Sequence, residues 1–238
     1  EGKFQWYYDT IEKPTTVVLS DMEKRGVHID QDHLRQFSKV LADKAEDRAG
    51  LARGIGIRST RGREVGACLE AAFGVLLPRT DHGNIRADEA ALLRLASADS
   101  YEQLCDRPPP HTAIQKVVLS ILSTREALTL KSLSADGLPK RADADGIIHP
   151  EWKQTTTITN RLACANPNFQ NVPIRGELAK PIRRAFIVPA GMKWVRVDMS
   201  QIEVRLFAHL TKDPTLLAAY PWDGPAQDVH QLVADGLG

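Results

Sequence analysis

The chain has 238 residues, with 31 basic and 30 acidic side chains, so its formal charge is close to zero at +1. With 42% hydrophobic and 26% charged residues, its composition is that of a globular protein large enough to bury a core. No apolar run approaches the ~20 residues of a membrane-spanning helix, and the first residues show no secretory signal pattern. Three widely spaced cysteines argue against a disulfide framework or a zinc site and favour a reducing compartment.

Helical spacing dominates the first 133 residues. It predicts helices over residues 11–25, 32–49 and 112–133, the first of them ended by Gly26. The second helix carries an apolar stripe made of Leu34, Phe37, Leu41 and Ala45. Ser59 is expected to cap a further helix.

The residue pattern changes near residue 145, from helical spacing to short β-branched or aromatic runs. Residues 134–146 contain glycine, proline and several charges, which is typical of a loop. Short β-branched or aromatic runs follow it and predict strands over residues 147–148, 155–159, 186–188 and 194–197. The sequence therefore predicts an α+β fold with a helical subdomain over residues 1–145 and a mixed or antiparallel sheet that begins in residues 146–238.

Charge is distributed unevenly along the chain. Between residues 152 and 197 there are eight basic side chains and one acidic side chain, and a smaller basic cluster lies at Arg53, Arg58, Arg61 and Arg63. Such segments suit a polyanion, whereas the alternative is a solvated basic face with no ligand.

Asp198 lies where a predicted strand gives way to a predicted helix. Val195 and Val197 would point to one face of the strand, so Asp198 would point to the other face at its end. A carboxylate placed there can meet a metal ion while the framework stays rigid, and Mg²⁺ often takes only one or two protein carboxylates.

A purely structural interpretation of the same segment stays open. Ser200 suits a helix N-cap, and Ser200 with Glu203 matches a capping box, which would leave Asp198 in a turn. In both interpretations the helix that follows has a buried stripe, which is made of Ile202, Leu206 and Leu210.

Amide side chains gather between two arginines, Arg161 and Arg175. Asn166, Asn168, Gln170 and Asn171 lie within six residues. Amides can bond the acceptors that every base pair presents in the minor groove, and arginines pair with phosphate. The alternative is an asparagine-rich loop that makes its own turns.

In chain order these motifs read R-L-x-x-x-x-P-N-x-Q-N-x-P-x-R, I-R-R-A-F-I, D-x-S-Q-I-E-x-R, A-H-L and D-x-H. This series resembles the family A DNA polymerases, the group of bacterial DNA polymerase I and its phage and organellar relatives. The resemblance is strongest from Arg161 to His230. It implies a helical thumb, with an N-terminal helix that packs on the palm, followed by the first part of that palm.

The resemblance also implies roles for individual residues. Asp198 would be the catalytic carboxylate and would bind two Mg²⁺ ions together with the backbone carbonyl of Met199. The segment that contacts the incoming nucleotide would comprise Ser200, Gln201, Ile202, Glu203, His230 and Arg175. The residues that contact DNA would be Arg161, Asn168, Gln170 and Asn171 near the primer terminus, and Ser59, Thr60 and Arg61 at the thumb tip.

Two segments of the sequence differ from the family pattern. Met199 replaces the usual tyrosine, and Ala163-Cys164-Ala165 replaces a serine- and threonine-rich run. The sequence also lacks a fingers helix, an H-D-E motif with the second metal-binding aspartate, and a proofreading domain. We therefore expect this polypeptide alone not to extend a primer.

Three functional hypotheses follow from these patterns. The first is a piece or one half of a split family A polymerase, acting in the cytoplasm on primer-template DNA and deoxynucleoside triphosphates. A split enzyme would need a second chain with the fingers and the remaining palm. The second is a non-catalytic module that binds duplex DNA, and the third is an unrelated metal-dependent hydrolase built around Asp198. None of the three involves a membrane.

Overall fold

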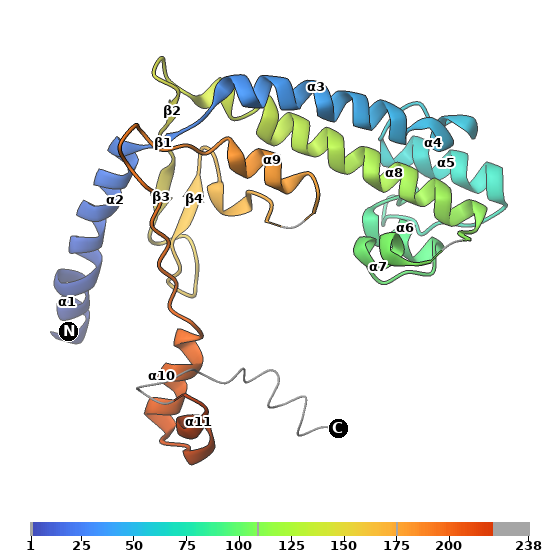
Figure 1. The fold of residues 1–238 in the computed structure, drawn as a ribbon. Helices are drawn as coiled ribbons and strands as arrows, with labels where there is room; N and C mark the ends of the chain where they lie inside the picture. The colour runs from blue at the N-terminus through green and yellow to red at the C-terminus, as the bar shows by residue number, and fades with distance from the viewer. Residues whose placement is uncertain (1, 109, 175, 221–238) are drawn as a thin grey trace. The chain divides into compact units, whose positions relative to one another are not determined.

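The computed structural model describes residues 2–108, 110–174 and 176–220. The chain divides into two compact units, residues 1–190 and 191–238. In the first unit a long helical arm, residues 31–130, extends from a smaller region that contains the strands (Figure 1).

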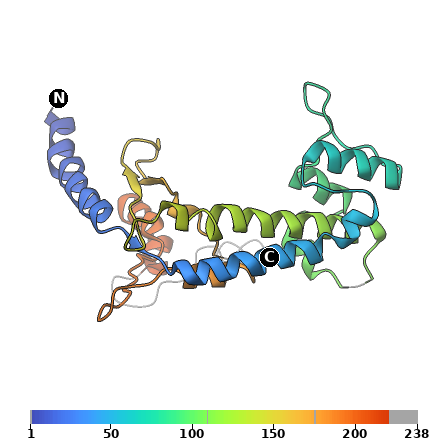
Figure 2. The same ribbon diagram turned by 90° about the horizontal axis from the view of Figure 1, so that it is seen from above.

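Two long helices form the length of the arm. Helix α3 (Gln31–Arg48) and helix α8 (Ala113–Leu130) lie side by side in both views (Figures 1 and 2). Asp30 caps α3 by accepting the His33 N–H at 2.8 Å, and Thr112 forms a capping box with Gln115 at the start of α8. The predicted helices over residues 32–49 and 112–133 are confirmed, and so is the buried stripe along α3.

Four shorter helices close the far end of the arm: α4 (Gly50–Gly54), α5 (Gly62–Phe73), α6 (Glu89–Leu95) and α7 (Tyr101–Asp106). Leu69, Leu92 and Leu104 are completely buried there, in one hydrophobic cluster with residues of α8. This cluster gives the tip of the arm a core of its own.

The N-terminal helices lead into two small sheets. Helix α1 (Gly2–Tyr7), the π-helical turn η1 (Tyr8–Glu12) and α2 (Lys13–Arg25) follow one another, and α2 ends at Gly26 as predicted. Gly26 has φ +62°, and a Cβ there would lie 2.7 Å from the Ile148 carbonyl oxygen. Only glycine therefore lets strand β1 (Val27–His28) pair with β2 (Ile147–Ile148) without strain.

A second antiparallel pair joins β3 (Glu151–Lys153) to β4 (Ala163–Ala165). Short helical segments complete the unit: η2 (Lys131–Ala135), η3 (Pro139–Arg141), η4 (Phe169–Asn171) and α9 (Ala179–Arg184). Helices with small antiparallel sheets confirm the α+β class. The subdomain boundary near residue 145 stays a prediction, and strands β1 and β2 pair across it.

Two predicted strands of this unit are wrong or reduced. Residues 155–159 form bends and a turn, because the Thr157 hydroxyl donates a hydrogen bond to the Arg161 carbonyl at 2.7 Å and closes the chain on itself. Of residues 186–188, Phe186 forms a single antiparallel bridge with Ile29.

The described part of the second unit contains two helices, α10 (Ile202–Thr211) and α11 (Pro214–Ala219), which pack against each other. Asp213 caps α11 by accepting the Leu216 N–H at 2.9 Å. In the ranges that the structure describes, no helix combines the length and the apolar character needed to cross a membrane.

His149 ties helix α2 to the loop before β2. Its Nδ1 lies 2.7 Å from the Glu23 carbonyl oxygen and its Nε2 lies 3.2 Å from Asp143 Oδ2. Both partners accept hydrogen bonds, so both ring nitrogens donate only in the imidazolium form. The carbonyl of Glu23 and then the carboxylate of Asp143 raise the pKa of His149 above its ordinary value of 6.5.

This contact makes the stability of the chain depend on pH. Because the folded pKa of His149 is raised, its contribution is complete below pH 6.5 and is lost as the pH rises through the folded value. We expect His149→Gln to lower the melting temperature at pH 6 and to have a much smaller effect at pH 9. Thermal unfolding of both proteins across this range checks the trend; an equal difference at both pH values would contradict it.

Candidate functional site

Asp198 lies on an exposed stretch, residues 192–199, that has no regular secondary structure. Arg196 Nη2 lies 3.5 Å from Asp198 Oδ2, and the two side chains remain 85% and 76% exposed. An ion pair as long and as exposed as this contributes little stability. The Asp198 carboxylate is therefore accessible from solvent.

The predicted strand over residues 194–197 is wrong for the described structure. Val195 and Val197 are 81% and 86% exposed, and no strand pairs with this segment within the residues that are described. A β-branched run becomes a strand only when a neighbour satisfies its backbone hydrogen bonds, so the local pattern alone was not sufficient.

Helix α10 starts differently from the prediction. Gln201, with φ +50°, occupies the N-cap position, and no side chain caps the helix. The Ser200 N-cap and the capping box with Glu203 are therefore both wrong. Instead, Arg205 Nε donates to the Ser200 carbonyl at 3.0 Å, and the Tyr220 hydroxyl donates to Gln201 Oε1.

The stripe predicted to be buried on α10 is exposed. Ile202, Leu206 and Leu210 all lie open to solvent, whereas Ala208 is the buried residue of this helix. The expected packing fails because α11, the described helix that contacts α10, leaves this apolar stripe uncovered. Glu203 is exposed on the first turn of the helix.

Residues 198 and 199 offer oxygen donors that suit Mg²⁺ but do not complete its coordination shell. Hard cations prefer oxygen ligands such as the Asp198 carboxylate and a backbone carbonyl like that of Met199, with water and substrate phosphate completing the shell. Across residues 2–108, 110–174 and 176–220, no three His, Cys, Asp or Glu side chains gather in a metal-binding cluster. The donors fit one part of a magnesium shell.

Side-chain amides of the amide-rich segment, residues 166–171, hold its backbone in place by hydrogen bonds. Gln170 Oε1 accepts the Cys164 N–H at 3.1 Å, and Gln170 Nε2 donates to the Leu162 carbonyl at 2.9 Å. Asn168 Oδ1 accepts the Gln170 N–H at 2.9 Å. Asn168 and Gln170 thus make the turns of this loop, and the DNA contact of the segment stays a prediction. Asn171 in this segment and Arg161 before it are exposed.

At the tip of the arm, Ser59, Thr60 and Arg61 lie together before helix α5. Ser59 does not cap α5 as predicted: its hydroxyl donates to Glu64 Oε2 at 2.5 Å, and Arg61 occupies the N-cap position. Glu64 also accepts the backbone N–H groups of Arg58 and Ser59. The Ser59 hydroxyl and then these N–H groups hold the pKa of Glu64 below its usual range.

A hollow of about 400 Å³ lies beside this loop, and Arg53, Arg58, Ser59 and Thr60 contribute to its wall. Thr60 also borders a second hollow of about 510 Å³ with Lys131 and Arg125. The structure thus brings further basic side chains near the predicted tip residues, and two of them, Arg53 and Lys131, pair with the acidic side chains of Glu46 and Asp136 in the same hollows.

Arg125 was missed from the sequence. Its guanidinium donates to the carbonyls of Ala87 at 2.6 Å and Thr60 at 3.1 Å, and so fixes the tip loop on α8. Burial lowers the pKa of Arg125. The residues it joins are 38 and 65 positions away in the chain, so no local signal could have revealed the contact.

The predicted site residues fall into separate parts of the chain. The DNA-contacting candidates lie in the first unit, whereas Asp198, Met199, Ser200, Gln201, Ile202 and Glu203 lie in the second. Arg175 and His230, both predicted to contact nucleotide, lie outside the described residues.

Comparison with known proteins places this arrangement in a family. The chain is 34% identical to the DNA polymerase I of Synechocystis over 94% of this chain. It is 33% identical to the thermostable DNA polymerase I of Thermus caldophilus over 100% of this chain. It spans 21% and 27% of these relatives, about a quarter of their length.

A solved structure agrees with the sequence comparison. The polymerase domain of Pol1 from M. smegmatis, in complex with DNA primer-template and dNTP, superposes with a TM-score of 0.70 at 30% identity, over 95% of this chain and 37% of that domain. The family pattern described as DNA polymerase family A matches residues 55–237. Together these matches show that the chain belongs to DNA polymerase family A.

Proposed function

We propose that the chain is part of a DNA-directed DNA polymerase that transfers deoxynucleotides to a primer 3′-hydroxyl, acting in replication or repair in the cytoplasm. The observation that carries the proposal is the match to the family over residues 55–237, which includes the segment around Asp198. The related M. smegmatis domain was solved with primer-template and dNTP, which supports the same substrates for this chain.

In this proposal Asp198 and the Met199 carbonyl hold magnesium. Two such ions would lower the barrier by activating the primer hydroxyl and by stabilising the charge on the leaving pyrophosphate. The exposure of Asp198 supports this role, because a metal ion can reach its carboxylate from solvent. Glu203, on the first turn of α10, would meet the sugar of the incoming nucleotide, and Ile202 would lie near the nascent base pair.

The first unit would grip the duplex. The helical arm would be the thumb, whose tip residues Ser59, Thr60 and Arg61 lie beside further basic side chains. Arg161, Asn168, Gln170 and Asn171 would follow the minor groove without reading sequence. The rigid turn built by Gln170 supports this role, because a fixed loop loses less entropy on binding.

The grip can be tested on the chain itself. We expect residues 1–238 to bind a short primer-template duplex with little regard to its sequence, and Arg61→Gln to weaken this binding. Each lost phosphate contact should reduce the salt slope of the binding constant by about 0.9. Fluorescence anisotropy titrations at several salt concentrations give the slope.

Arg35→Gln serves as a matched control, because Arg35 is exposed near the start of α3 and pairs with Asp32 at 2.6 Å. It should leave the slope unchanged. Identical slopes for wild type and Arg61→Gln would contradict the assignment of the tip to phosphate contact.

A further inference from the structure

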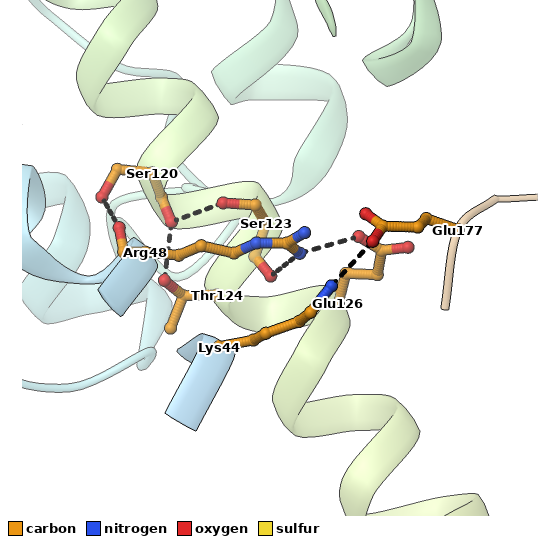
Figure 3. A network of polar contacts seen from close by, with 7 residues as sticks. All are labelled: Lys44, Arg48, Ser120, Ser123, Thr124, Glu126 and Glu177. Atoms are coloured by element: carbon orange, nitrogen blue, oxygen red, sulfur yellow. Dashed lines mark hydrogen bonds and ion pairs between the residues drawn. The ribbon is translucent and has the colours of Figure 1, made fainter. Parts of the chain in front are cut away.

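A polar cluster joins the arm to the loop that precedes helix α9. Lys44 Nζ on α3 lies 2.9 Å from Glu177 Oε1, and Arg48 Nη1, one turn further along α3, lies 3.6 Å from Glu126 Oε2 on α8 (Figure 3). Arg48 Nη1 also donates to the Ser123 carbonyl at 3.4 Å. Lys44 thus holds Glu177 in the loop. Arg48, on the same face of α3, bonds to α8.

The apolar stripe of α3 continues this contact. Phe37 and Leu41 pack in one buried cluster with Leu178 and Ile182. Along the loop and α9, the apolar residues Leu178 and Ile182 come after Glu177. Along α3, the apolar residues Phe37 and Leu41 come before Lys44. The segment 177–182 therefore lies along one face of α3, with an apolar contact towards the base of the arm and an ion pair towards its tip.

The loop before α9 passes close to Glu126 on α8. A Cβ on Gly176 would lie 3.8 Å from Glu126 Oε1, so the loop passes directly over the Glu126 carboxylate. Burial raises the pKa of Glu126, the nearby Arg48 charge partly offsets this rise, and the charge of Glu177 adds to it. The charges of Glu126 and Glu177 repel each other, and Lys44 offsets the charge of Glu177.

The amide-rich segment comes before this loop in the chain. Phe169 packs edge-to-face on Phe186 with ring centroids 5.6 Å apart, so the segment is anchored beside the end of α9. Glu177 lies in the chain between the segment with Asn168 and Gln170 and the helix that packs on the arm. Its contact with Lys44 can therefore set where the segment lies relative to α3.

We infer that Lys44 and Glu177 form a positioning pair that holds the amide-rich segment in register with the helical arm, so that both grip one duplex. The inference rests on the proposed function and extends it to residues that touch no DNA. Lys44 would act by neutralising Glu177 beside the Arg48–Glu126 pair, and its loss would leave the Glu177 charge unbalanced next to Glu126.

The effect should be modest but specific. The Lys44 and Glu177 side chains are 32% and 74% exposed, and pairs of this kind change an equilibrium by roughly twofold to fivefold. Lys44→Met should speed amide hydrogen exchange in residues 177–184 by about this factor, and weaken duplex binding similarly. Adding Glu177→Gln should restore both, because it removes the repulsion.

Two control variants separate position from net charge. Lys39→Met removes a charge from an exposed site on the same helix, and Glu89→Gln removes an exposed carboxylate on α6. We expect Lys39→Met to leave exchange in residues 177–184 unchanged. Glu89→Gln, added to Lys44→Met, restores the net charge and should leave exchange fast.

The experiment is hydrogen exchange without DNA, followed by duplex binding, on the 238-residue chain and these variants. Equal exchange in Lys44→Met and Lys39→Met, or equal rescue by Glu89→Gln and Glu177→Gln, would overturn the pair. Faster exchange with unchanged duplex affinity would overturn its positioning role. Failure of the wild-type chain to bind duplex would instead contradict the proposed function, while the exchange result still decides whether the pair holds the loop.

Discussion

Replacing Asp198 with Asn in a complete polymerase is expected to reduce primer extension by on the order of 10³-fold, which corresponds to about 4 kcal/mol of transition-state stabilisation. The amide keeps the size of the carboxylate but loses the charge that would hold magnesium. Because this chain spans about a quarter of its relatives, the substitution belongs in a chimera in which the chain replaces the matched part of the M. smegmatis Pol1 polymerase domain.

Two comparisons make this result specific. Asp81→Asn, in an exposed turn of the arm, changes the formal charge equally and should leave extension unchanged. Duplex binding by Asp198→Asn, measured without magnesium, should match that of the unaltered chimera. Single-turnover extension rates give the loss; a rate within tenfold of the unaltered chimera would contradict a metal-binding role for Asp198.

Leu41→Ala is expected to lower the free energy of unfolding by about 2–5 kcal/mol, since truncating a buried leucine removes apolar contact and leaves a cavity. Leu41 is completely buried, in the cluster that joins α3 to α9. Urea denaturation of the chain, followed by circular dichroism, measures the change.

Leu76→Ala is the matched control. Leu76 is 88% exposed, so its truncation should change the free energy of unfolding by no more than about 0.5 kcal/mol. Equal losses for the two variants would show that the cluster between α3 and α9 does not support the fold as described.

The helices could be predicted from the sequence because their signals are local. The stripe from Leu34 to Ala45 repeats at helical spacing, and Gly26, with φ +62°, ends α2. The local structure of residues 155–159 and 194–197 could not be predicted in this way, because a strand exists only with a partner. Thr157 bonds within its own turn, and residues 194–197 have no partner in the described part of the chain.

The site was predicted through its motif rather than through its local structure. The motif predicts that Asp198 binds metal, and this stays a prediction. The predicted Ser200 cap and the predicted buried stripe of α10 are both absent from the described structure. Ser59 was assigned to a cap, whereas it bonds Glu64. No local pattern points to Lys44, because its partner Glu177 is 133 positions away in the chain.

In the proposed function, Asp198 binds the catalytic metal. Anomalous scattering from Mn²⁺, in crystals of the chimera with primer-template and an incoming nucleotide, tests it most directly. We expect a peak at about the 2.0–2.2 Å distance of a hard-cation ligand from an Asp198 carboxylate oxygen, with the Met199 carbonyl in the same shell. A manganese peak bound by other residues, with Asp198 turned away from it, would contradict the account.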